Sequence, residues 1–248
     1  MSWRLPMSEP NKLEDTRKAI RAWKEKQGPQ TWQTDLATEE AIVALEAKGG
    51  RPIATALKDM WRTFLAGDEI DFTNDNLSIT LYSPSGLVKA LTPDTTSLYE
   101  PRPLRGLGLI NYLNYCWGND QPVLDMKEGT RVNNEDFTYT ASAELEEIDV
   151  ALTCFGHFMD DYCEAHLVLH FDKEGTFGVT HWNQDEKIPL EPTVTGYKTP
   201  EDIFLKCLQG HDAICAAALE EDPEYLSFSL EMLVDFLKTG TVPDLDKY

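Results

Sequence analysis

The side chains best suited to chemistry lie in one stretch, residues 154–171, which reads CFGHFMDDYCEAHLVLHF. It holds three of the five histidines, two of the five cysteines, two adjacent aspartates and a glutamate. These residue types bind metal ions or act as acids, bases and nucleophiles. Whether they gather around one point depends on whether the segment is a helix or a pair of strands.

Two periodicities compete for residues 143–165. Apolar residues from Leu145 to Tyr162 recur at intervals of three and four, which fits an amphipathic helix. The alternation of apolar and polar residues over 148–158 and 163–171 instead indicates two antiparallel strands. A turn at Asp160 and Asp161 would place Phe158 opposite Cys163, and every apolar position would then share one face.

A second hairpin is predicted at the turn DKEG, residues 172–175. A three-residue loop with Gly175 in the left-handed region sets Phe171 opposite Phe177 and Leu169 opposite Val179. The strand interpretation is therefore consistent along the whole segment.

This geometry bears on the metal question. In a strand, His166 and His170 share a face with Cα atoms roughly 13 Å apart at about 3.3 Å per residue, whereas zinc needs nitrogens at about 2.0–2.1 Å. His157 is expected across from Glu164, as an ordinary cross-strand pair. The histidines are thus interpreted as part of a solvated sheet face, with no catalytic residue, metal ligand or cofactor predicted. A helix would reverse this conclusion, because His166 and His170 would face one ion.

Motifs elsewhere point to no enzyme class. The chain has no GxSxG, P-loop or HExxH motif, and its five cysteines are widely spaced without a CxxC pair. They are expected to be small core residues in a reducing cytosol. Because no run of 18 apolar residues and no signal-peptide core is present, a cytoplasmic protein without a membrane segment is predicted.

Charge is distributed unevenly along the 248 residues. Residues 1–130 carry 15 Lys/Arg and 18 Asp/Glu, a net charge of −3, whereas residues 131–248 carry 7 and 25, a net charge of −18. A surface of that sign repels nucleic-acid phosphates and anionic lipids, and it attracts basic proteins. The expected partner is therefore a basic protein, and neither nucleic acid nor a membrane.

The predicted fold class is α+β, with N-terminal helices, a central mainly antiparallel sheet or meander, and a C-terminal helical pair. The first helix carries a stripe of Leu13, Ile20 and Trp23, the second begins after Thr38, and the third spans 53–67. A hairpin is expected around the turn at 83–86, and another helix over 106–120.

The second half is expected to continue with a strand over 137–143 and the two hairpins, and then a helical pair that begins after Thr199 and Asp222. The polar segment 118–136 is the predicted boundary. It divides a helical/α+β N-terminal half, residues 1–130, from an acidic half with the sheet and the last helices, residues 131–248, as two domains or one continuous domain.

A family resemblance lies in residues 37–67, ATEEAIVALEAKGGRPIATALKDMWRTFLAG. The order of a helix, a Gly followed by a Pro, and an aromatic-containing helix resembles the opening of SUKH-superfamily proteins. Where that family has an aromatic-Asn-Gly-Gly element, this chain has FLAGDEI. The resemblance implies a bacterial immunity protein that binds and neutralises a toxin, and it transfers no functional residue.

The sequence therefore predicts a non-catalytic protein-binding protein, specifically an immunity or inhibitor protein with a basic partner such as a toxin. The predicted contact residues are Asp160, Asp161, Tyr162, Glu164, His166 and His170. Two alternatives stay open. One is a metal-dependent hydrolase that uses His157, His166 and His170, and the other is a structural component of a phage or secretion assembly.

Overall fold

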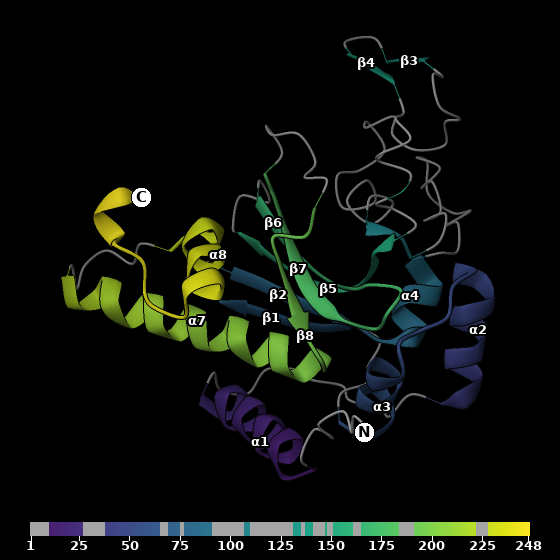
Figure 1. Ribbon diagram of the computed structural model, residues 1–248, viewed down its shortest axis with the longest axis horizontal. Coiled ribbons are helices and arrows are strands. Elements are labelled where there is room, and N and C mark those ends of the chain that lie inside the picture. Colours follow the sequence, from purple (N-terminus) through teal and green to yellow (C-terminus); the bar gives the residue numbers. More distant parts are fainter. Residues whose placement is uncertain are drawn as a thin grey trace, which may run out of the picture.

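A computed structural model gives the fold, which is shown in Figure 1. It describes residues 10–26, 38–64, 69–74, 77–90, 107–109, 131–134, 137–140, 147, 151–160, 165–183, 191–221 and 228–248. The helices are α1 (Pro10–Lys26), α2 (Glu39–Gly49), α3 (Thr55–Thr63), α4 (Pro84–Ala90), α7 (Pro200–Glu221), α8 (Leu230–Thr239) and the 3-10 helix η1 (Leu245–Lys247). The strands are β1 (Glu69–Asn74), β2 (Leu77–Tyr82), β3 (Arg131–Asn134), β4 (Phe137–Thr140), β5 (Thr153–Asp160), β6 (Ala165–Phe171), β7 (Phe177–Asn183) and β8 (Val194–Tyr197).

A six-stranded sheet forms the centre of the molecule, in the order β1-β2-β5-β6-β7-β8, and each neighbouring pair is antiparallel. β2 pairs with β5, with Leu77 opposite Asp160, so the sheet takes strands from both sides of the predicted boundary. The predicted α+β class, with helices first, an antiparallel sheet in the middle and a helical pair last, is confirmed.

The strand predicted over 137–143 is present as β4, but it does not join the meander. It pairs with β3 in a separate two-stranded sheet, seen at the top right of Figure 1. Of the helix predicted over 106–120, only residues 107–109 are described. There Cys154 N donates to Leu107 O at 2.9 Å, and Leu109 N donates to Leu152 O at 3.1 Å, which places this segment beside the start of β5.

The C-terminal helices α7 and α8 pack against one face of the sheet (Figure 1). Phe158 of β5 contacts Phe204 of α7, with ring centroids 6.0 Å apart. At the α7–α8 crossing Gly210 lies so close to Leu233 and Phe236 that a Cβ atom would approach their side chains to 2.7 and 2.6 Å. Part of the apolar core therefore lies between this sheet face and the helical pair, and the same buried cluster continues into residues of α1, α2, α3 and α4.

Helix boundaries follow the capping residues of the sequence. Thr38 Oγ1 accepts from Ala41 N at 3.2 Å at the start of α2, and Thr199 Oγ1 accepts from Asp202 N at 3.2 Å at the start of α7, as predicted. α8 differs from the prediction, because its cap is Ser229, whose Oγ accepts from Met232 N, and not Asp222. Asp222 itself lies outside the described residues.

The segment after β2 corrects the predicted hairpin around 83–86. β2 is present, but the residues that follow form the helix α4. Ser83 Oγ accepts from Gly86 N at 3.0 Å and Ser83 O accepts from Leu87 N at 3.0 Å, so Ser83 caps the helix and Pro84 occupies its first position. The strand partner of β2 on that side is instead the polar segment β1.

The hairpin β5–β6 has the predicted strands in a different register. Phe158 lies opposite Leu167 and not Cys163, and Asp160 ends β5 instead of forming a two-residue turn. The Oδ1 atom of Asp160 accepts from Ala165 N at 3.4 Å, across a connection of four residues. Because the shift of the partner is an even number of residues, the side chains keep their predicted faces along this part of the strands.

The next hairpin, β6–β7, is confirmed in register and in turn. Phe171 lies opposite Phe177 and Leu169 lies opposite Val179. Gly175 has φ 75° and donates its N–H to Asp172 O, while Asp172 N donates to Thr176 O. This is the three-residue loop that the DKEG turn predicts.

An irregularity in β5 decides where Phe155 points. The register shifts between Cys154 and Gly156, which is a β-bulge. Regular alternation from Cys154 to Gly156 would turn Phe155 to the outward face, but it is fully buried and packs edge-on against Phe177 at a centroid distance of 5.6 Å. Gly156 brings β5 close to β2, because a Cβ there would lie 2.6 Å from Thr80 O.

Within the described parts of the chain, no helix is long and apolar enough to cross a bilayer.

Candidate functional site

The histidines of residues 154–171 lie on the sheet face opposite α7 and α8. Thr80 lies across from His157, Val168 lies across from both His157 and Thr180, and Trp182 lies across from His166. Strand alternation therefore places these side chains on one face, and Leu167, Leu169 and Val179 on the other. The predicted pairing of His157 with Glu164 is wrong, as a consequence of the register.

Four rings form a row across this face, one from each of β2, β5, β6 and β7. The ring centroids of Tyr82 and His157 are 5.9 Å apart, those of His157 and His166 are 6.4 Å apart, and those of His166 and Trp182 are 6.0 Å apart and stacked. The Tyr82 hydroxyl lies 3.4 Å from His157 Nδ1.

Burial is the main correction to the sequence interpretation of this face. His157 is 6% exposed, and His166 and His170 are each 1% exposed. The expectation that these histidines lie on a solvated sheet face is therefore wrong. Alternation distinguishes one face of a strand from the other, but it does not show whether a polar face meets water or is covered.

Burial also sets the charge state of two histidines. Desolvation, with the neighbouring His166 as a second cause, lowers the pKa of His157 to about 3. Desolvation lowers the pKa of His170 to about 4, against a backbone hydrogen bond at Val179 and the charge of Asp172, which both raise it. His170 Nε2 also lies 3.0 Å from Thr180 Oγ1. At neutral pH both imidazoles are neutral and take part in hydrogen bonds.

The alternative function as a metal-dependent hydrolase would need several metal-ligating side chains close together. Among the described residues, no three His, Cys, Asp or Glu side chains come together in a way that could hold a metal ion.

The structure describes three of the six predicted contact residues. His166 and His170 are buried, so in this structure they do not present their side chains on an outer surface. Asp160 is half-buried at the end of β5, where it closes the hairpin to Ala165. Asp161, Tyr162 and Glu164 lie outside the described residues.

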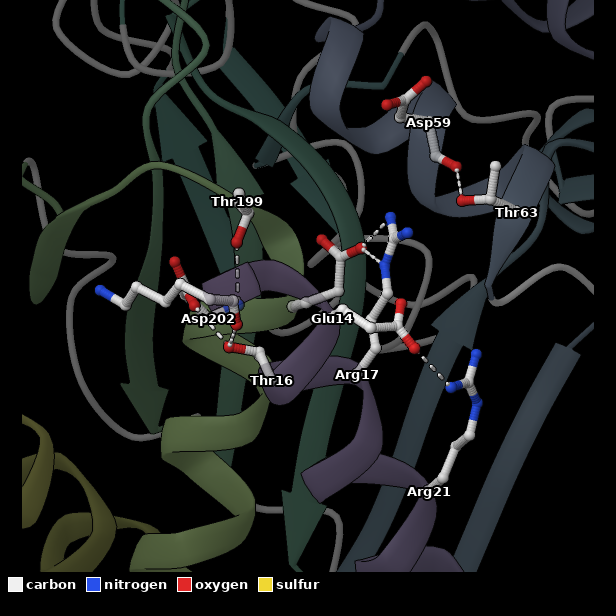
Figure 2. Close-up of polar contacts among 10 residues, drawn as sticks. Glu14, Thr16, Arg17, Arg21, Asp59, Thr63, Thr199 and Asp202 are labelled. Atoms are coloured by element: carbon white, nitrogen blue, oxygen red, sulfur yellow. Dashed lines mark hydrogen bonds and ion pairs between the residues drawn. The ribbon is translucent and has the colours of Figure 1, made fainter. Parts of the chain in front are cut away.

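A polar cluster that the sequence interpretation missed joins α1 to the start of α7 (Figure 2). Arg17 Nη2 lies 2.8 Å from Glu201 Oε1 and its Nε donates to the same oxygen at 2.9 Å. Thr16 Oγ1 donates to Asp202 Oδ1 at 3.2 Å. The Arg17 side chain is 13% exposed and that of Glu201 only 1%, so this ion pair is largely buried.

A third bond continues the contact between α1 and α7 towards the middle of α7. Trp23 Nε1 donates to Asp212 Oδ1 at 2.8 Å. Arg21, on the outer side of α1, is half-exposed, bonds Glu14 at 3.3 Å and lies 4.8 Å over the ring of Phe64. The signal in the sequence was present, because α1 has a basic composition and α7 begins with two acidic residues, but nothing in the sequence pairs elements more than 180 residues apart.

Comparison with known proteins adds no assignment. No family model, curated protein or solved structure matches the chain. The resemblance of residues 37–67 to SUKH-superfamily proteins therefore stays a prediction.

Proposed function

We propose that this chain is a non-catalytic protein-binding protein, and that it acts as an immunity or inhibitor protein on a basic partner such as a toxin. The observation that carries the proposal is the charge of residues 131–248, a net −18 against −3 for the rest of the chain. Such a field speeds encounter with a basic surface and repels acidic ones.

The described part of the second half carries a share of this charge. Of its 25 acidic and 7 basic residues, 14 and 6 lie within the described ranges, a net of −8. Several of these carboxylates are exposed on helices and turns around the sheet: Glu174, Glu191, Glu220, Glu231 and Asp246. They are available for contact with a cationic surface.

The contact between α1 and α7 supports the proposed mode of recognition. α1 contains six Lys/Arg and three Asp/Glu, and three acidic side chains of α7 accept hydrogen bonds from it. These are Glu201, Asp202 and Asp212. Carboxylates of α7 thus hold α1 through hydrogen bonds, of which one, from Arg17, comes from a basic side chain and two come from the neutral Thr16 and Trp23. Hydrogen bonds to charged groups are the strongest kind in proteins.

We further propose that the encounter takes place in the cytoplasm. Cys154, Cys207 and Cys215 are free thiols, which is the state that a reducing compartment maintains.

The proposal is tested by capture of partners from lysate of the source organism, followed by measurement with the purified partner. We expect a protein of basic net charge whose affinity falls steeply between low and high salt, because the interaction is electrostatic. Failure to capture any basic protein, or an affinity that does not depend on salt, would contradict the proposal.

Two matched variants localise the surface. In the first, Glu174, Glu191, Glu220 and Glu231 are replaced by Gln. In the second, four exposed acidic residues of the first half are replaced in the same way: Glu14→Gln, Asp15→Asn, Glu25→Gln and Glu40→Gln. The first variant is expected to lose about tenfold or more in association rate, and the second to change little. Equal losses would contradict a surface in the second half.

A further inference from the structure

Cys215 has surroundings unlike those of the other described cysteines. Cys154 and Cys207 are buried, as the sequence predicts for all five, and burial raises the pKa of the Cys207 thiol. Cys215 is half-buried, and its Sγ lies 3.5 Å from Nε2 of His211, one turn earlier on α7. A thiol in contact with a histidine ring is the arrangement of a nucleophile with its activating group.

A carboxylate lies on the other side of the imidazole. Nδ1 of His211 is 3.7 Å from Asp212 Oδ1, and this same oxygen accepts the 2.8 Å hydrogen bond from Trp23 of α1. The ring of Phe228 meets the His211 ring edge-on at a centroid distance of 4.9 Å. His211 is 5% exposed, so its orientation is fixed by packing as well as by charge.

The electrostatics favour a charged imidazole at this position. Burial opposes the charge, but Asp212 and the sulfur of Cys215 outweigh it and raise the pKa of His211 to about 9. For Asp212, burial is likewise outweighed by His211, Trp23 and the charge of Lys26 at the end of α1, and its pKa is lowered. The carboxylate and the imidazolium therefore coexist beside the thiol at neutral pH.

We propose that Cys215 and His211 form a nucleophilic thiol–imidazole pair, and that Cys215 is a site of covalent modification by small electrophiles. The thiol of Cys215 releases its proton to water, the Nε2–H of the His211 imidazolium donates to the resulting thiolate, and the sulfur lone pair attacks an electrophilic carbon. The S–C bond forms while the bond to the leaving group breaks, and the leaving group departs with that electron pair. Asp212 is a positioning residue, because it touches the imidazole and not the sulfur.

The exposure of each cysteine determines whether a small reagent can reach its sulfur. Cys215 is only half-buried, whereas Cys207, two turns earlier on the same helix, has no exposed surface. A small reagent reaches the first sulfur and not the second. Cys207 therefore serves as an internal control for the intact fold.

The experiment measures alkylation of the native full-length chain by iodoacetamide, with peptide mass spectrometry to separate the cysteines and glutathione in the same tube as reference. Here iodide is the leaving group. At about pH 6.5 we expect Cys215 to react about tenfold faster than glutathione, because a positively charged N–H donor lies 3.5 Å from the attacking sulfur, and we expect Cys207 to stay unmodified. A Cys215 rate no higher than that of glutathione at this pH would overturn the proposal.

Two variants assign the effect to the pair. His211→Gln is expected to slow alkylation of Cys215 about tenfold at about pH 6.5 and to leave it within about threefold at about pH 9.5, where thiols ionise without help. Asp212→Asn is expected to give a smaller loss with the same pH dependence. An unchanged rate in His211→Gln would contradict the proposal. If Cys207 becomes reactive in that variant, the variant has lost its fold. The proposal is then tested by the wild-type chain alone, through the alkylation rate of Cys215 relative to glutathione at about pH 6.5.

Discussion

Arg17 of α1 and Glu201 of α7 form an ion pair of 2.8 Å in which the carboxylate is 1% exposed. The two residues are 184 positions apart in the sequence. Burial raises the pKa of Glu201, against the hydrogen bond and charge of Arg17, which lower it. The pair therefore fixes α1 to the start of α7, and the charge of Glu201 depends on its partner.

Arg17→Met is expected to destabilise the fold by about 3–5 kcal/mol at neutral pH, because Glu201 is left buried without a counter-charge. Because burial favours the protonated form of Glu201, the loss should be smaller in acid, for example at about pH 5. Urea unfolding at the two pH values measures this. The control is Lys18→Met, on the same helix with a side chain 66% exposed, for which about 0–1 kcal/mol is expected. Equal effects of the two variants would contradict a buried pair.

The buried histidines predict a loss of stability in acid. Unfolded imidazoles titrate near pH 6.5, whereas the folded pKa values are about 3 for His157 and about 4 for His170. Between these values the unfolded state binds more protons, so the free energy of unfolding falls as pH falls from about 6.5 to about 4. Above about pH 6.5 the two histidines contribute no pH dependence.

His170→Gln is expected to reduce this acid loss by on the order of 2 kcal/mol at about pH 5, as measured by chemical denaturation at about pH 5 and pH 7. Thr180→Val is the control, because it removes the 3.0 Å contact to His170 but leaves the imidazole to titrate. It should lower stability similarly at both pH values. A His170→Gln variant with the acid loss of the wild type would show that His170 is not the group responsible.

At Gly210, inside α7, we expect a substitution by alanine to destabilise the protein. Alanine normally stabilises a helix interior by about 1 kcal/mol relative to glycine, but here its Cβ would approach Phe236 Cδ1 to 2.6 Å and Leu233 Cδ1 to 2.7 Å. Gly210→Ala is therefore expected to cost about 1–3 kcal/mol. The neighbouring Gln209 is exposed, and Gln209→Ala should be close to neutral in the same thermal unfolding experiment. A stabilising Gly210→Ala would mean that α7 and α8 have room to separate.

Two tryptophans donate to acceptors that differ in their access to water. Trp23 donates to Asp212, whose side chain is 39% exposed, while Trp61 donates to the buried carbonyl of Tyr82 at 2.9 Å. Trp23→Phe is expected to cost about 1 kcal/mol, because water replaces the lost donor, and Trp61→Phe about 2 kcal/mol or more, because the carbonyl is left unsatisfied. Denaturant titration of both variants compares them. The reverse order would contradict this account.

Local signals in the sequence determined much of the secondary structure. Thr38 and Thr199 begin helices because their hydroxyls satisfy backbone N–H groups within three residues. The β6–β7 register followed from a three-residue loop and Gly175. These features depend on neighbours in the chain, so the sequence alone is enough to place them. Ser83 shows the limit, because the same Ser-Pro pair serves a turn or a helix cap, and the structure uses it as a cap.

Tertiary structure decided whether a polar face of the sheet meets water. It also decided which side chains that are distant in the sequence contact each other. Alternation put His157, His166 and His170 on one face, but only the folded chain shows that this face is covered and that burial keeps two of these imidazoles neutral. Likewise, the contacts of Arg17 with Glu201 and of Trp23 with Asp212 join residues that no local pattern relates. The charge of the second half can be read from composition, because it is a sum over residues. Burial depends on which elements pack together, and that is a property of the whole fold.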